Sequence, residues 1–184
     1  MDLTIKITSA ILETKRKKIV SEMKNKIIEE SINCLQQEGL RFSVDSLAER
    51  LKISKKTIYK YFPTKEAIAY AIYEKYYNDL QDEIKEIVRI NDSTMPSELL
   101  LCYFDSSKMV RKEIFNKYCL NDSIGSFALQ RHLNIWGVIK PYVCSKITDD
   151  EVEVYKLIID GAFNKAIDLN VDCVTVIKVL RRLI

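Results

Sequence analysis

Hydrophobic residues recur at helical spacing along most of the chain, and no segment alternates apolar and polar residues as a half-buried strand does. From Ile19 onward, one apolar stripe carries Val20, Met23 and Ile27 and continues until Gly39, a residue type that commonly ends helices. Residues 1–18 precede this stripe and are interpreted as a basic N-terminal extension. The pattern therefore predicts an all-α protein whose first helix begins at Ile19.

Short polar residues that cap helices divide the next part of the chain. Ser43, Ser54 and Thr64 each precede a helical pattern, and each hydroxyl can accept a hydrogen bond from a free N–H of the first turn. Pro63 ends the middle helix, because the residue before a proline is disfavoured in the α region. These signals predict helices over residues 44–51, 55–61 and 65 to about 90.

The second half of the chain shows one clear loop, residues 91–96, where Asn, Asp, Ser, Thr and Pro cluster. Thr148 and Glu151 have the spacing of a capping box and mark a helix start. Further helices are predicted at about 97–109, 111–120, 123–144, 149–169 and 172–184.

The segment 43–62, SVDSLAERLKISKKTIYKYF, combines two short helices with a break of only two residues, Lys52-Ile53. Helices joined so tightly cannot run side by side, and this arrangement is the helix-turn-helix, whose second helix enters the DNA major groove. Small Ala48 allows the two helices to approach closely, while Ile58 fills the angle between them. The polar residues of the second helix then fall on its outer side.

The charge distribution supports a polyanionic partner for this segment. The net charge is +3, but residues 1–66 carry 14 Lys and Arg against nine Asp and Glu, so the basic excess lies at the front. From Lys52 to Lys65 there are five lysines and no acid. An ordinary exposed helix mixes both signs, whereas a helix facing phosphates has reason to exclude carboxylates.

Residues 19–68 resemble the N-terminal domain of the TetR family of bacterial regulators. The resemblance implies an all-helical fold with three DNA-binding helices, a linking fourth helix and a helical regulatory and dimerisation domain. It also implies a homodimer that a small ligand releases from DNA. Lys52 departs from the family, which often has glycine in the turn, and Lys56 replaces what is often a small residue. The matching elements are Cys34-Leu35, Gly39, Ser43-Val44, Leu47-Ala48, Ile53-Ser54-Lys55, Thr57-Ile58-Tyr59, Tyr61-Phe62 and Pro63-Thr64-Lys65-Glu66.

The pattern and the resemblance together divide the chain into an extension (1–18), a DNA-binding domain (19–66) and an effector-binding and dimerisation domain (67–184). Thr57 and Tyr59 are candidates for contact with base edges, although a purely positioning role is an equal alternative. Lys56 is placed at a base or at a phosphate. The run Lys15 to Lys18 is interpreted as a minor-groove arm or, preferably, as a solvated tail. The expected phosphate ligands are Ser43, Lys55, Lys60, Tyr61 and Lys65.

Aromatic residues of the second half suggest a pocket for a small apolar or aromatic effector, although most aromatic residues at helical spacing are core. His132 is the only histidine, so the chain has no pair of histidines at metal-binding spacing. His132 is interpreted as structural or pocket-lining. The candidate pocket residues are Tyr103, Phe104, Tyr118, Phe127, His132 and Trp136.

The helix predicted at 149–169 is apolar on more than one side, which is more than a surface helix needs. The excess predicts burial against a second copy of the chain, in a four-helix interface about a two-fold axis. A central core helix in a monomer is the alternative. The candidate interface residues are Ile159, Ala162, Phe163 and Ala166.

Other function classes find less support. The five cysteines are scattered without a CxxC pair, and the four glycines form no GxGxxG or GxSxG motif, so no metal, cofactor or catalytic residue is expected. The chain shows no signal peptide and no apolar run long enough for a membrane, which predicts a cytoplasmic protein. Besides a regulator that binds double-stranded DNA, a helical module that binds only other proteins stays open.

Overall fold

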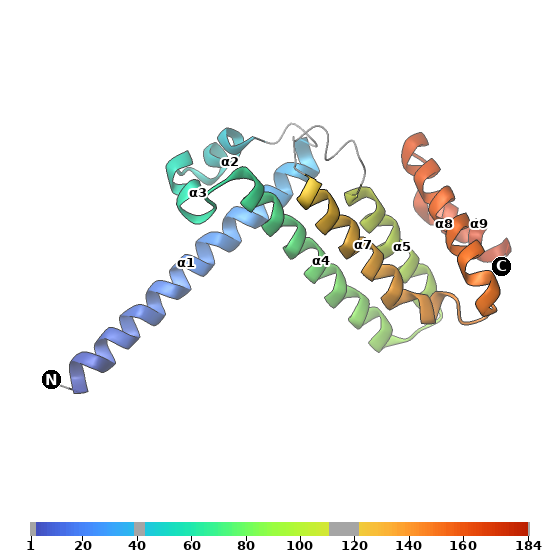
Figure 1. The fold of residues 1–184 in the computed structure, drawn as a ribbon, viewed down its shortest axis with the longest axis horizontal. Helices are drawn as coiled ribbons and strands as arrows, with labels where there is room; N and C mark the ends of the chain where they lie inside the picture. The colour runs from blue at the N-terminus through green and yellow to red at the C-terminus, as the bar shows by residue number, and fades with distance from the viewer. Residues whose placement is uncertain (1–2, 39–42, 111–121, 184) are drawn as a thin grey trace. The chain divides into compact units, whose positions relative to one another are not determined.

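The computed structural model describes residues 3–38, 43–110 and 122–183, and the regular structure in these ranges is entirely α-helical (Figure 1). The predicted all-α fold is therefore confirmed. The predicted helix at 111–120, Gly39 and Tyr118 lie outside the described residues. The described helices are α1 (Leu3–Glu38), α2 (Val44–Leu51), α3 (Lys55–Tyr61), α4 (Lys65–Ile90), α5 (Met95–Met109), α7 (Asp122–Val143), α8 (Asp149–Leu169) and α9 (Cys173–Leu183).

The chain forms two compact units, one ending at Lys75 and the other beginning at Tyr76, so that α4 contributes residues to both. None of the helices in the described ranges has the length and hydrophobicity needed to cross a lipid bilayer. The limits 1–18, 19–66 and 67–184 stay predictions.

The first unit is built around the C-terminal half of α1, which contacts α2 and α3. Its apolar stripe buries Ile27 and Cys34, with Ser31 between them, whose hydroxyl donates to the Ile27 carbonyl at 2.6 Å. Leu47 of α2 and Ile58 of α3 are also fully buried. Each of these helices is apolar on one side only, so the apolar sides of α1, α2 and α3 pack together in one small core.

Helix α1 begins at Leu3, so the helix start predicted at Ile19 is wrong. Residues 13–22 are helical, yet all of their side chains are exposed. A stripe of apolar residues reports where a helix packs rather than where it exists, and the Lys, Arg and Glu of this stretch favour helix without packing.

The second unit packs α5 against α7, α8 and α9. Helix α5 starts at Met95, two residues before the predicted start, and Pro96 lies in its first turn, where the missing N–H costs nothing. The capping box of Thr148 and Glu151 is present at the start of α8, with the Thr148 N–H donating to the Glu151 carboxylate at 3.2 Å.

Three of the four predicted dimer contacts are buried in the single chain. They are Ile159, Phe163 and Ala166 of α8, and the Phe163 ring centroid lies 5.0 Å from that of Phe104. Side chains that their own subunit covers offer little surface to a partner. Of the four predicted residues, only Ala162 is partly exposed.

Three of the predicted pocket residues, Tyr103, His132 and Trp136, lie together in this core. The Tyr103 ring stacks on His132 at 4.7 Å between centroids and lies 5.3 Å from Trp136. Tyr103 also donates a hydrogen bond to Asp160 at 2.9 Å, and Asp160 pairs with Lys156. Tyr103, His132, Trp136 and Phe104 are buried, whereas Phe127, Lys156 and Asp160 are half-buried.

Candidate nucleic-acid interface

The turn between α2 and α3 has the conformation expected from its sequence. The Ser43 hydroxyl caps α2 by accepting from the Ser46 N–H at 3.1 Å. At the other end, Lys52 adopts the left-handed conformation, with φ 53° and ψ 40°, and its N–H bonds to the Glu49 carbonyl at 3.1 Å. The next N–H, that of Ile53, reaches the Ala48 carbonyl at 3.0 Å. These two hydrogen bonds end α2 and redirect the chain within two residues.

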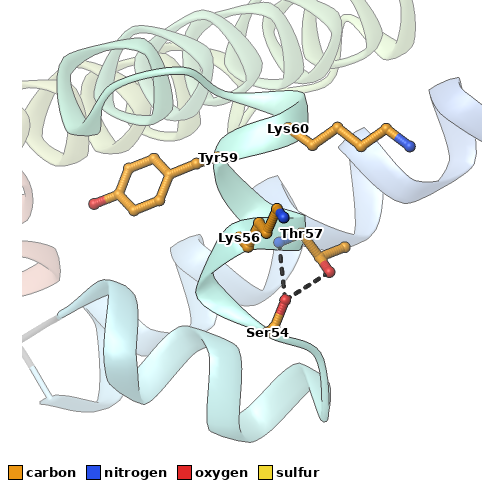
Figure 2. A pocket seen from close by; sticks show the side chains of 5 residues that line it. All are labelled: Ser54, Lys56, Thr57, Tyr59 and Lys60. Carbon is orange, nitrogen blue, oxygen red and sulfur yellow. Dashed lines mark hydrogen bonds between the residues drawn. The ribbon is translucent and has the colours of Figure 1, made fainter.

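Helix α3 is capped in the same way. The Ser54 hydroxyl accepts from the Thr57 N–H at 3.1 Å and lies 2.9 Å from the Thr57 hydroxyl (Figure 2). Ile58 is fully buried, and Phe62 at the C-cap is nearly so. Because its inner residues are held in the core, the outer face of α3 keeps a defined orientation.

That outer face carries Lys56, Tyr59 and Lys60, all exposed. Together with Ser54 and Thr57 they line an open hollow of about 490 Å³, and in Figure 2 Tyr59 and Lys60 point in different directions from the helix. Within the part of the chain that the structure describes, Lys56 and Lys60 form no salt bridge. Their charges are therefore exposed to solvent and can interact with a polyanion.

The other candidate DNA contacts have more protein neighbours. Lys55 forms a salt bridge with Asp45 of α2, with 2.5 Å between Nζ and Oδ1. Thr57 is half-buried and shares its hydroxyl with Ser54, so its methyl group is the part left for a ligand. Ser43, Tyr61 and Lys65 are half-buried.

Two contributions were missed by reasoning from the sequence. Asp45 of α2 contributes an acid next to α3, although residues 52–65, which include α3, contain no acid. Lys24 of α1 lies with its Nζ 5.9 Å from the centroid of the Phe62 ring, at the C-terminal end of α3. Both residues are distant from α3 in sequence, and no local signal indicated either contact.

Two capped helices at a tight turn, the second with exposed lysines, define a helix-turn-helix DNA-binding protein. Residues 27–72 match the family described as bacterial regulatory proteins, tetR family. These residues are therefore similar to the N-terminal domain of that family of DNA-binding transcriptional regulators. No curated protein and no solved structure matches the chain.

Proposed function

We propose that this protein is a cytoplasmic homodimeric transcriptional regulator, which binds a palindromic operator through α3 and leaves it when a small molecule binds the second unit. Repression is the expected sign of regulation. The observation that carries the proposal is the exposed face of Lys56, Tyr59 and Lys60 on a helix whose inner side is locked in a core. Such a face can be pressed into a major groove without rearrangement.

Within this interface, the lysines supply affinity and the smaller groups supply sequence preference. Lys55, Lys60 and Lys65 bind phosphates, helped by Ser43 and Tyr61, and Lys56 binds either a phosphate or a base. Thr57 offers its methyl group to thymine, and the Tyr59 hydroxyl offers a hydrogen bond to a base edge. The exposed position of Tyr59, with 40% of its surface accessible, supports this role.

An exposed apolar face on α8 supports the homodimer, in place of the residues predicted from the sequence. Val154, Leu157 and Ile158 are exposed, Leu157 by 72%. Gly161, one turn further, is also exposed, and a Cβ there would meet nothing within 4 Å. A second copy of α8 can therefore approach this face closely and bury it about a two-fold axis. Two α3 helices would then be held at the spacing of a palindrome.

Release by an effector is proposed to work through α4, the one helix with residues in both compact units. Its 26 residues make it about 39 Å long and stiff, so a tilt at one end displaces the other. A small apolar or aromatic molecule is proposed to bind near Tyr103, His132 and Trp136. It binds more tightly to the dimer with one spacing of the two α3 helices than to the dimer with the other spacing. A hundredfold effect needs about 2.7 kcal/mol of differential affinity. Spin labels on the two α3 helices test it: release at an unchanged distance distribution would contradict the mechanism.

The experiment that tests DNA binding is selection of fragments from genomic DNA, followed by titration of the best fragment at several salt concentrations. We expect affinity to fall steeply with salt and to exceed the affinity for an unrelated duplex of equal length. Folded protein that binds no duplex at low salt would favour the alternative, a module that binds only other proteins.

A further inference from the structure

Residues 13–22 of α1 form a helical stretch that its own unit does not cover. Helix α1 has 36 residues, and among those with described side chains the first buried one is Ile27. The four consecutive cations Lys15 to Lys18 lie in the exposed stretch before it. They therefore lie on an exposed helical segment that is continuous with a packed helix, rather than on a coil.

Two of these cations, Arg16 and Lys17, lie on or beside the face of α1 that is buried further along the helix. Residues three, four, seven or eleven positions apart share a helix face, so the buried side of Ile27 and Ser31 extends towards the N-terminus through Val20 and Arg16. Lys17 flanks this face, whereas Lys15 and Lys18 lie on the opposite side. Val20 marks the point where the face is no longer covered, since 39% of it is accessible.

The same face passes the end of α3. Lys24, on its edge, lies beside Phe62, the C-cap of α3. Arg16 and Lys17 are eight and seven residues nearer the N-terminus than Lys24, which is about 10–12 Å further along the helix axis. Double-stranded DNA carries one charge per about 1.7 Å of its axis. A duplex seated on α3 and continuing past its C-terminal end would therefore bring further phosphates within reach of these two cations.

We propose that Arg16 and Lys17 form a second, sequence-independent DNA contact, which binds the phosphate backbone flanking each half-site. This inference rests on the proposed DNA binding by α3. Lys17 pairs with Glu13 at 3.2 Å, but both side chains are more than half exposed, and such a pair contributes little against a phosphate. Charge complementarity selects the occupant, because the segment belongs to the unit that carries the helix-turn-helix.

The segment itself supplies a matched control. Arg16→Gln with Lys17→Gln removes two charges from the face next to α3, and Lys15→Gln with Lys18→Gln removes two from the opposite face. The probe is a genomic fragment recovered by selection, prepared once trimmed to the protected footprint and once with ten additional base pairs on each side. Circular dichroism of both double variants verifies that α1 stays helical.

We expect the Arg16/Lys17 variant to lower the log–log salt slope on the long duplex by about 2 for each protomer, about 4 for the bound dimer, and to lose the affinity that the flanks add, about tenfold or more at low salt. The Lys15/Lys18 variant should change both quantities much less, and Arg16→Lys alone should keep the slope. Equal losses in the two double variants would overturn the proposal, as would an unchanged slope in the first.

Two further outcomes are informative. If the unmodified protein binds no duplex, the proposed function itself fails, and this is distinguishable from binding that is indifferent to the flanks. Vesicles containing phosphatidylserine provide the competing partner. Loss of vesicle binding in the Arg16/Lys17 variant, with DNA binding unchanged, would assign the segment to a lipid surface and contradict the proposal.

Discussion

Lys55 of α3 and Asp45 of α2 form a salt bridge across the helix-turn-helix, with 2.5 Å between Nζ and Oδ1. Both side chains are about half exposed or more, so the pair contributes little to folding. It nevertheless matters for DNA binding, because the carboxylate neutralises one of the lysines on the reading helix and stands close to any phosphate that this lysine would bind.

We therefore expect Asp45→Asn to tighten DNA binding several-fold and to steepen the salt slope by up to about 1 for each protomer of the bound dimer, since Lys55 then neutralises a phosphate instead of an acid. Asp45 also lies in the first turn of α2, so a loss of a few tenths of a kcal/mol in stability is expected. Asp82→Asn, which breaks the exposed Asp82–Lys85 pair of α4, is the matched control and should leave the affinity unchanged. Equal or weaker DNA binding by Asp45→Asn would place the DNA away from Lys55.

Lys60→Ala and Thr57→Ala should change DNA binding in different ways. Loss of the Lys60 charge should weaken binding about equally for all sequences and lower the salt slope by about 1 for each protomer of the bound dimer. Thr57→Ala should leave the slope unchanged and relax the preference at one or two base positions by about 1–3 kcal/mol. Titrations of the selected fragment and of single-base variants separate the two effects. A sequence preference that survives Thr57→Ala intact would leave Thr57 as a positioning residue.

The left-handed conformation of Lys52 leads to a prediction about stability. A side chain with a Cβ costs roughly 1 kcal/mol in this region, and glycine does not carry that cost. Lys52→Gly should therefore raise the free energy of unfolding by about 0.5–1 kcal/mol, while Lys52→Val should lower it by more. Urea unfolding measures both, and Lys52→Asn should fall between them. If Lys52→Gly is the less stable protein, the strain at this turn is not what limits stability.

Leu157 and Phe163 lie on the same helix but should respond differently. Leu157→Glu should yield a folded monomer with weakened operator binding, because it places a charge on the exposed face of α8. Phe163→Ala should instead cost about 3–5 kcal/mol of stability, because its ring fills the core beside Phe104. Sedimentation and thermal unfolding distinguish the two. A Leu157→Glu protein that sediments as a dimer would move the interface to another surface.

His132 should make stability depend on pH. Burial lowers its pKa from 6.5 to about 4, although Asp160 opposes this shift, and the Nδ1 atom lies 2.9 Å from the Ser106 hydroxyl. The folded protein therefore holds a neutral ring, whereas the unfolded chain binds a proton below pH 6.5. Stability from this residue is full above that pH and falls by about 3 kcal/mol as the pH drops to about 4. Denaturant titrations should show a smaller pH slope for His132→Asn, and an equal slope would show that other groups titrate.

Local chemistry determined the helix-turn-helix before any tertiary contact was known. Ser43 and Ser54 cap their helices as predicted, and the left-handed turn falls at Lys52. These features involve hydrogen bonds between residues at most five apart, so residues close in sequence suffice to specify them. The same holds for the capping box of Thr148 and Glu151. The outer face of α3 follows directly, because Ile58 must point inward.

Only the tertiary structure decided which apolar side of α8 is the core. Leu157 and Phe163 are both large and apolar, and a stripe of such residues predicts burial without saying against what. Packing of α5 covers Phe163 and leaves Leu157 exposed. The start of α1 at Leu3 and the Asp45–Lys55 pair escaped prediction for related reasons. A helix that packs against nothing shows no stripe, and a contact between separate helices depends on where the whole fold places them.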